Sequence, residues 1–351
     1  MRLLGLIVVE DGARSRISGT RGYALERIGN RPIVEHVLEA LELAGVDEVL
    51  VASSSAHSNG IRECLSAREK PNGPRIRYLH REAPLEVTDA LRMAAPVIGN
   101  SPCVVHLGNG LLDESLAPFV DRTWDAPDVA LLVHQTAGHD EHLSAATQEM
   151  LHLAPLSADH ALGMAGVWLF GSGALPLAVA APWSLCGDVD LTMLGKRIAA
   201  ADGAFQVKLV DGWHHYRGDP LDLLELNRIV LDRLEAGLRR ACNKGNRIEG
   251  RVWIHEAASV HGSVIIGPTV IGPGARIADS YIGPYTSIGE RARVEGVEVE
   301  RSIISPGASV MHVGGRLVAS VVGCDARVFR DFSLPRALRL RVGDGTEVAL
   351  C

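Results

Sequence analysis

The stretch ADSYIGPYTSIGERARVEGVEVERSII, residues 278–304, decides the fold of the C-terminal part of the chain. An aliphatic residue recurs there every five or six positions, usually followed by a small one. The repeating pairs are Ile271-Gly272, Ile277-Ala278, Ile282-Gly283, Ile288-Gly289 and Val294-Glu295. Such hexapeptide repeats are typical of a parallel β-helix, in which aliphatic side chains fill a narrow prism and small neighbours allow tight corners. We therefore predict a left-handed parallel β-helix over residues 251–351, acting as a scaffold or an oligomerisation element.

The chain before these repeats alternates short apolar runs with amphipathic segments. LLGLIVV (residues 3–9) predicts a buried strand, RPIVEHVLEALELAG (31–45) a helix ending at Gly45, and VDEVLVAS (46–53) the next strand. Repeated βα units imply a Rossmann-like α/β domain with a mostly parallel sheet and helices on both faces. We predict this domain at 1–240, closed by a long helix, and a linker at 241–250.

Composition narrows the classes of partner. The formal net charge is −7 and no long basic run occurs, which argues against a nucleic-acid surface. The six cysteines are scattered without a CxxC pair, as is typical of reduced thiols. No apolar run reaches the length of a membrane span. We therefore expect a cytoplasmic protein with neither nucleic acid nor membrane as its partner.

Five further stretches, in chain order with the repeats, carry a family resemblance. They are GNRPIVEHVLEALELAGVDEVLV (29–51), EAPLEVTDAL (82–91), VVHLGNGLL (104–112), GDVDLT (187–192) and GWHHYRGDPLDLLELNR (212–228). Together they resemble the long form of glucose-1-phosphate thymidylyltransferase, within the sugar-phosphate nucleotidyltransferases. The resemblance implies a nucleotidyltransferase domain followed by a β-helix, and condensation of a nucleoside triphosphate with a sugar 1-phosphate, which releases pyrophosphate. It also implies Mg²⁺ and a homo-oligomer.

The family's phosphate-binding positions are altered in this chain. By the resemblance, its glycine-rich loop falls on residues 8–14, where Gly12 and Arg14 remain but Glu10 and Asp11 add negative charge. Its lysine falls on Tyr23, which carries no cation. Carboxylates beside a triphosphate repel it unless a metal intervenes.

The family's metal- and sugar-binding positions are altered too. Its magnesium aspartate falls on Asn109, its second metal carboxylate on Tyr216, and the glycine that leaves room for the base on Glu86. Its sugar-contacting acid and lysine fall on Leu153 and Ala154. An amide oxygen can ligate Mg²⁺ but adds no charge. These losses predict that the fold persists while nucleotidyl transfer has been abandoned.

Three functions remain open. The chain is a pseudoenzyme, partnering an active paralogue or pathway enzyme, or it is an enzyme repurposed for a small anionic substrate in specialised metabolism. The third alternative is an active sugar-1-phosphate nucleotidyltransferase with unusual metal ligands such as Asp11, Asp188 or Asp190. No cofactor is expected, and Mg²⁺ enters only in the third alternative.

Candidate site residues follow from the same segments. Imidazoles and a phenol can carry protons, whereas arginines, an amide and exposed backbone can hold a polar ligand. The candidate catalytic residues are His106, His214, His215 and Tyr216. The candidate substrate-binding residues are Gly12, Arg14, Arg81, Glu82, Asn109, Gly166, Asp188 and Arg217.

Plainer interpretations stay open beside these roles. His106 also fits a packed, hydrogen-bonded strand residue, and His214 and His215 a solvated loop. Glu10 and Asp11 fit turn caps, and Asp188 and Asp190 fit acids at a helix start.

Two further sites are weaker alternatives. His134, His139 and His142 are a candidate zinc set on a stretch that also fits an exposed loop. His261 and His312 are the candidates for a β-helix acyltransferase, a function the short, uninterrupted repeats do not favour.

Overall fold

The computed structural model describes residues 2–10, 22–68, 73–120, 125–136, 161–180, 191–235 and 245–332. Contacts divide the chain into two compact units. The first holds the described residues of 2–10, 22–25 and 33–215, and the second those of 26–32 and from 216 onward. The predicted domain boundaries at 240 and 251 stay predictions, and the contacts group residues 216–235 with the second unit.

The first unit is built on a seven-stranded sheet. Its strands lie in the order β10-β8-β9-β6-β1-β4-β5. They are β1 (Leu4–Val9), β4 (Glu48–Ser54), β5 (Arg75–Arg81), β6 (Cys103–Leu107), β8 (Val129–Thr136), β9 (Ala161–Phe170) and β10 (Phe205–Leu209). All neighbouring pairs are parallel except those of β9, which runs antiparallel to β6 and β8. The predicted mostly parallel sheet is confirmed.

Helices cover both faces of this sheet. They are α1 (Ile33–Leu43), α2 (Ser55–Ser66), α3 (Val87–Ile98), α5 (Ala174–Val179) and α6 (Leu191–Ala200), with 3-10 turns η1 (Tyr23–Leu25) and η2 (Ala117–Phe119). Every residue of β1 is buried, as an unbroken apolar run requires in a sheet covered on both sides. Leu6 and Val8 lie in one core cluster with Leu91 of α3 and Ile198 of α6.

The predicted helix over residues 31–45 is confirmed as α1. Its buried positions Val34, Val37, Leu38 and Leu41 recur at three- and four-residue spacing, so one helical face packs inward. The chain turns at Gly45, whose φ of 77° favours glycine.

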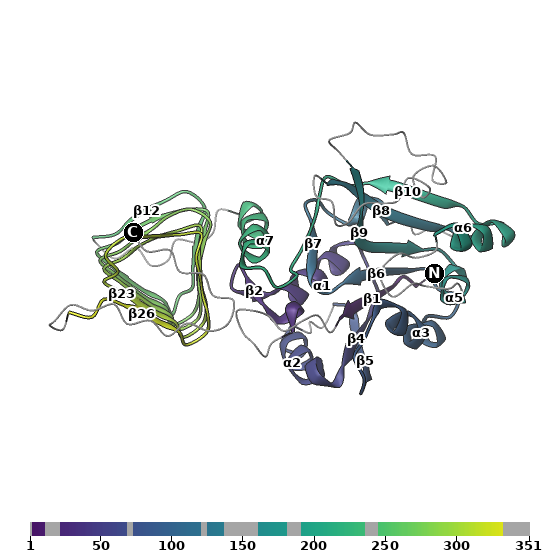
Figure 1. Ribbon diagram of the computed structural model, residues 1–351, viewed down its shortest axis with the longest axis horizontal. Helices are drawn as coiled ribbons and strands as arrows, with labels where there is room; N and C mark the ends of the chain where they lie inside the picture. Colours follow the sequence, from purple (N-terminus) through teal and green to yellow (C-terminus); the bar gives the residue numbers. More distant parts are fainter. Residues whose placement is uncertain are drawn as a thin grey trace. The chain divides into compact units, whose positions relative to one another are not determined.

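The second unit contains the coil, which we define as residues 245–332. Its fifteen short strands form three parallel five-stranded sheets, the three faces of a triangular prism (Figure 1). The sheets are β12-β15-β18-β21-β24, β13-β16-β19-β22-β25 and β14-β17-β20-β23-β26. The strands are β12 (Arg247–Glu249), β13 (Val252–Ile254), β14 (Ser259–His261), β15 (Val264–Ile266), β16 (Thr269–Ile271), β17 (Arg276–Ala278), β18 (Tyr281–Ile282), β19 (Thr286–Ile288), β20 (Arg293–Glu295), β21 (Glu298–Glu300), β22 (Ile303–Ile304), β23 (Ser309–Met311), β24 (Arg316–Val318), β25 (Val321–Val322) and β26 (Arg327–Phe329).

The aliphatic residues of the repeat form the interior of the coil. Ile271, Ile277, Ile282 and Ile288 are each 1% exposed or less and share one core cluster. The repeat therefore does what its spacing predicts, and the parallel β-helix is confirmed.

A helix and a hairpin complete the second unit. Helix α7 (Pro220–Asp232) begins where Asp219 Oδ1 accepts a hydrogen bond of 2.9 Å from the backbone N–H of Leu221. Proline suits the first position of a helix because an N–H at that position would have no acceptor within the helix. The hairpin pairs β2 (Arg27–Ile28) with β3 (Arg31–Pro32) in antiparallel register.

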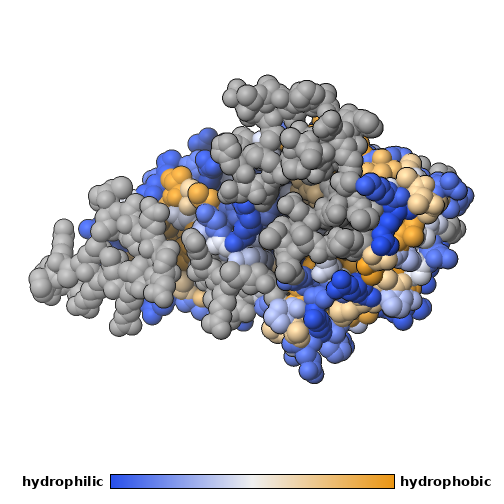
Figure 2. Space-filling view, turned by 45° about the vertical axis from the view of Figure 1, so that its right-hand side comes forward, coloured by the Kyte–Doolittle hydropathy of each residue, from blue (hydrophilic) through white to orange (hydrophobic). Residues whose placement is uncertain are grey.

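Within the described residues, no helix combines the length and apolar character needed to span a membrane. Figure 2 shows hydrophilic side chains interspersed with smaller hydrophobic patches on the face in view.

Candidate functional site

The carboxyl ends of β1 and β6 lie side by side in the first unit. The strands pair in parallel, with Val8 opposite Leu107, and the backbone N–H of Gly108 donates to the carbonyl of Val8 at 2.8 Å. Glu10 follows β1 directly, and Asn109 follows Gly108. Ligands of open α/β sheets bind at this edge. The candidate site is therefore centred here.

Glu10 brings an acid of altered acidity to this edge. Burial raises the pKa of its carboxyl above the usual range, and the negative charge of Glu86 raises it further. Glu86 precedes α3 and is exposed. A group that disfavours its own negative charge at this position also disfavours a second anion beside it.

Asn109 lies between β6 and a two-stranded ribbon. The ribbon pairs β7 (Gly110–Leu112) antiparallel with β11 (Trp213–His215), with Gly110 opposite His215. Tyr216 follows β11 and is fully buried. The positions that the resemblance assigns to metal-binding carboxylates thus hold an amide and a phenol.

These residues do not fit a magnesium site. Mg²⁺ prefers charged oxygen ligands in octahedral array. Over the parts of the chain that the structure describes, no group of three or more His, Cys, Asp or Glu residues could hold a metal ion. The alternative ligands Asp11, Asp188 and Asp190 lie outside the described residues.

His106 is a packed strand residue. Its side chain is 1% exposed, and Nδ1 lies 2.6 Å from the carbonyl oxygen of Leu107. Burial lowers the pKa of its imidazole from 6.5 to about 4, although the hydrogen bond to Leu107 opposes the shift. The ring is therefore neutral near pH 7 and donates its Nδ1 proton to that carbonyl. Of the two interpretations that the sequence left open, this geometry matches the packed one; a catalytic role stays a prediction.

Trp213 fills a slot beside His106. The two rings meet edge to face with centroids 5.5 Å apart, and His215 stacks on Trp213 at 6.0 Å. A Cβ on Gly166 would lie 2.5 Å from Trp213 Cζ2, and one on Gly110 would also overlap the indole. Both glycines are thus needed to make room for Trp213. Gly166, predicted to bind substrate, contributes to this packing.

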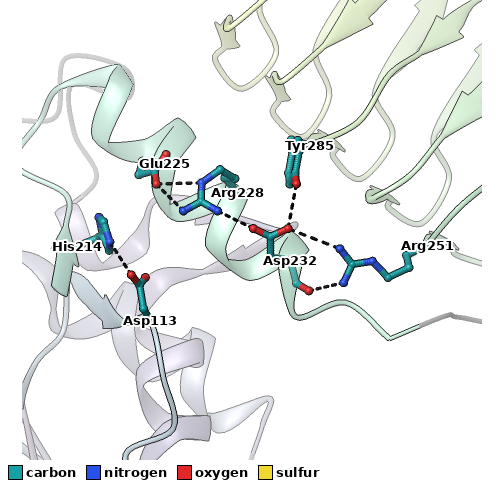
Figure 3. A network of polar contacts seen from close by, with 7 residues as sticks. All are labelled: Asp113, His214, Glu225, Arg228, Asp232, Arg251 and Tyr285. Atoms are coloured by element: carbon teal, nitrogen blue, oxygen red, sulfur yellow. Dashed lines mark hydrogen bonds and ion pairs between the residues drawn. The ribbon is translucent and has the colours of Figure 1, made fainter. Parts of the chain in front are cut away.

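His214 forms a pair with Asp113 on the same ribbon (Figure 3). Its Nε2 lies 3.2 Å from Asp113 Oδ2, and each side chain is 32% exposed. Gly212 lies alongside, where a Cβ would overlap the carboxylate of Asp113. A histidine oriented by a carboxylate and open to solvent can carry a proton.

Of the three arginines expected to bind substrate, Arg81 and Arg217 are described, and each lies beside a carboxylate. Arg81, at the end of β5, pairs with Asp89 of α3. In the second unit, Arg217 is exposed, with Nε 3.9 Å from Asp222 Oδ2. Glu82, which follows Arg81, is exposed.

The remaining candidate residues either lie outside the described residues or lie elsewhere in the fold. Gly12, Arg14 and Asp188 lie outside the described residues, as do His139 and His142 of the zinc hypothesis. His134 is buried, with Nδ1 3.1 Å from the carbonyl oxygen of Gln135. On the coil, His312 Nε2 lies 3.7 Å from Glu295 Oε1.

Sequence reasoning missed Asp113 and Trp213. Asp113 meets His214 across 101 residues of chain, through a ribbon of three-residue strands too short to leave a periodic signal. The two glycines were the available sign of Trp213, because a missing Cβ often marks a close approach.

Comparisons with known proteins agree with this architecture. Residues 22–141 match the family model described as nucleotidyl transferase. The chain is 29% identical to a glucose-1-phosphate thymidylyltransferase of Streptomyces griseus over 95% of both chains. It is 27% identical to the low-salt glycan biosynthesis nucleotidyltransferase Agl11 of Haloferax volcanii, over 98% of this chain and 99% of that one.

A solved structure shares the fold. The crystal structure of a putative glucose-1-phosphate thymidylyltransferase from Bacillus anthracis superposes with a TM-score of 0.51 at 16% identity. The match covers 64% of this chain and 94% of that one. Residues 22–141 are thus similar to the nucleotidyl transferase family, and glucose-1-phosphate thymidylyltransferases are homologues of the chain over nearly its full length.

Proposed function

We propose that this chain has kept the fold of a sugar-1-phosphate nucleotidyltransferase, has lost nucleotidyl transfer, and serves as a pseudoenzyme that partners another protein. One observation carries the proposal. The edge formed by β1 and β6 presents the acid Glu10, whose pKa is raised by burial and by Glu86, and the uncharged amide Asn109.

The physical reason lies in the leaving group. Nucleotidyl transfer expels pyrophosphate, whose growing negative charge must be met by fixed cations or a metal ion in the transition state. Acids and a neutral amide at this edge supply neither. Neither Glu10 nor Asn109 therefore gives electrostatic support to the chemistry for which the relatives are named.

Pyrophosphate release tests this proposal. The full chain is incubated with Mg²⁺, glucose 1-phosphate and each nucleoside triphosphate in turn, beside an active thymidylyltransferase as the positive control. We expect release no faster than in reactions without protein. Release at a rate near that of the positive control would restore the active-enzyme alternative.

The His214–Asp113 pair favours a second candidate, an enzyme with new chemistry. The pair is solvent-accessible and could move a proton on a bound substrate. The expected small anionic substrate would have to compete with Asp89 for Arg81 and with Asp222 for Arg217.

A thermal-shift screen with sugar phosphates and nucleotides separates the two candidates. A shift that is lost in both His214→Gln and Asp113→Asn, but kept in the exposed coil variant His261→Gln, would favour the enzyme. No shift across the screen favours the pseudoenzyme.

The pseudoenzyme proposal includes assembly. We propose that the chain forms a homo-oligomer or joins an active paralogue, and light scattering of the purified chain measures the first. A mass equal to one chain at all concentrations would contradict the homo-oligomer.

A further inference from the structure

The tip of the β2–β3 hairpin is shaped for close approach to α7. Gly29 and Asn30 have φ values of 55° and 68°, the left-handed conformation that two-residue hairpin turns require. A Cβ on Gly29 would lie 2.6 Å from Val230 Cγ1, so only glycine fits against the helix.

A single buried amide joins this tip to α7 and the coil. Asn227 of α7 is fully buried, and its Oδ1 accepts from the backbone N–H of Gly29 at 2.9 Å and from Ser287 Oγ at 2.6 Å. Its Nδ2 donates to the carbonyl of Tyr285 at 3.1 Å. Asn30 adds a bond of its own, because its Nδ2 donates to the carbonyl of Ile288 at 2.8 Å.

Helix α7 is also bonded to the coil through its last residue, Asp232 (Figure 3). Asp232 Oδ1 accepts from Tyr285 Oη at 3.0 Å and lies 3.5 Å from Arg251 Nη2, while Oδ2 accepts from Arg228 at 2.6 Å. The helix can therefore stay on the coil when the hairpin leaves. If the hairpin left α7, Asn227 Oδ1 would lose its hydrogen bond from the backbone N–H of Gly29. Losing a hydrogen bond in a buried position costs free energy, so the docked hairpin is favoured.

We propose that the hairpin is a conformational clasp, through which the coil controls the conformation of the segment just before it, residues 22–25. That segment carries Tyr23, at the position where the resemblance places the family's lysine, and only Glu26 separates it from β2 of the hairpin. Because linkage is reciprocal, whatever stabilises the docked hairpin also stabilises the arrangement of residues 22–25 that docking favours. The coil would then influence the conformation of residues 22–25 through the docked hairpin. The clasp stands whether or not the chain has lost nucleotidyl transfer.

Hydrogen exchange on the full chain, read by mass spectrometry, tests the clasp. The variant Asn227→Ala removes the shared amide, and Asn30→Gly removes the bond to Ile288 while keeping a residue suited to positive φ. Asn246→Ala is the matched control, because among the described residues the side chain of Asn246 bonds to Val260 and Ser263, both in the coil.

We expect exchange in residues 26–32 about tenfold faster in Asn227→Ala, which corresponds to about 1.4 kcal/mol. Asn30→Gly should act in the same direction to a smaller extent. Hydrogen exchange in residues 22–25 should become faster together with that in the hairpin. Asn246→Ala should leave the exchange rates of both segments unchanged.

Two outcomes would overturn the clasp. One is faster hydrogen exchange in residues 26–32 without a change in residues 22–25, because the coil would then not affect the preceding segment. The other is an equal response to Asn246→Ala, which would mean general loosening of the second unit. If Asn227→Ala does not fold, Asn30→Gly decides by the same criteria.

Discussion

His106 places an ionisable ring in the interior of the sheet, where burial lowers its pKa and favours the neutral form. Its Nδ1 proton is held by the carbonyl of Leu107, and Trp213 packs against the ring. The residue before the end of strand β6 is thus polar, and one of its ring nitrogens is bonded to the backbone. The His214–Asp113 pair beside it is partly exposed to solvent.

The buried imidazole should make stability depend on pH. In the folded chain the pKa of His106 is about 4, against 6.5 when exposed, so the unfolded chain binds more protons between these values. Stability is therefore lost as the pH falls from about 6.5 toward 4. Urea unfolding across this range should show His106→Gln losing less stability than the parent chain, by up to about 3 kcal/mol at the acid end. If the free energies of unfolding of the variant and the parent changed equally with pH, the buried imidazole would be contradicted. His261→Gln, at an exposed histidine, is the control.

The glycine slot around Trp213 should be intolerant of a single methyl group. Gly166→Ala should lower the free energy of unfolding by about 1–3 kcal/mol, because the added Cβ overlaps the indole of Trp213 and the side chain of Leu107. In a Trp213→Leu background the same change should cost less, which a double-mutant cycle in urea measures. Gly195→Ala is the control, since its Cβ meets nothing within 4 Å in helix α6 and alanine should stabilise there. Equal costs in both backgrounds would contradict the slot.

Among the elements, the coil draws stability from serines as well as isoleucines. Ser280, 6% exposed, donates from Oγ to the carbonyl of Ala278 at 2.7 Å and accepts from the backbone N–H of Val297 at 3.3 Å. Its own N–H donates to Ser263 Oγ on the rung before. The hydroxyls thus bond backbone groups across successive rungs at one corner of the prism.

Removing one of these hydroxyls should destabilise the coil. Ser280→Ala should cost about 1–3 kcal/mol, because Val297 N–H loses its partner in a buried corner. Ser259→Ala, at an exposed position of β14, should change stability by no more than about 0.5 kcal/mol. Thermal unfolding followed by circular dichroism compares the two, and equal effects would show that the corner hydroxyls do not matter.

Elements were predictable where one local rule fixes them. The isoleucine spacing predicts the coil because each rung repeats the same inward and outward positions, and the pattern from Val34 to Leu41 predicts α1 in the same way. The antiparallel direction of β9 was not predictable, because strand direction depends on how the chain returns to the sheet. The bond between Gly29 and Asn227 joins residues 198 positions apart, and no local pattern encodes it.

Over the whole molecule, the order of domain, helix and coil followed from sequence, whereas the chemistry of the site followed only in part. Asn109 and Glu10 could be located because they adjoin strands whose position the apolar pattern fixes. The His214–Asp113 pair could not, since it depends on the register of the ribbon. The fold is thus encoded more redundantly than the site it carries.

Restoring two lost carboxylates should not restore the reaction. We expect Asn109→Asp combined with Tyr216→Asp to release no pyrophosphate with Mg²⁺, glucose 1-phosphate and a nucleoside triphosphate. The reason is that Glu10 would remain at the end of β1 and Tyr23 would still lack a cation. Circular dichroism must first show that the double variant folds. Recovery of release by this change alone would mean that the missing cation and the added acid are unimportant.

If nucleotidyl transfer has been lost as we propose, the edge of the sheet formed by β1 and β6 should not bind a magnesium-bound nucleoside triphosphate. Isothermal titration of the full chain with thymidine triphosphate in excess Mg²⁺, repeated in EDTA, tests it most directly. We expect no saturable heat of binding in either condition. Saturable binding that requires Mg²⁺ and disappears in EDTA would contradict it.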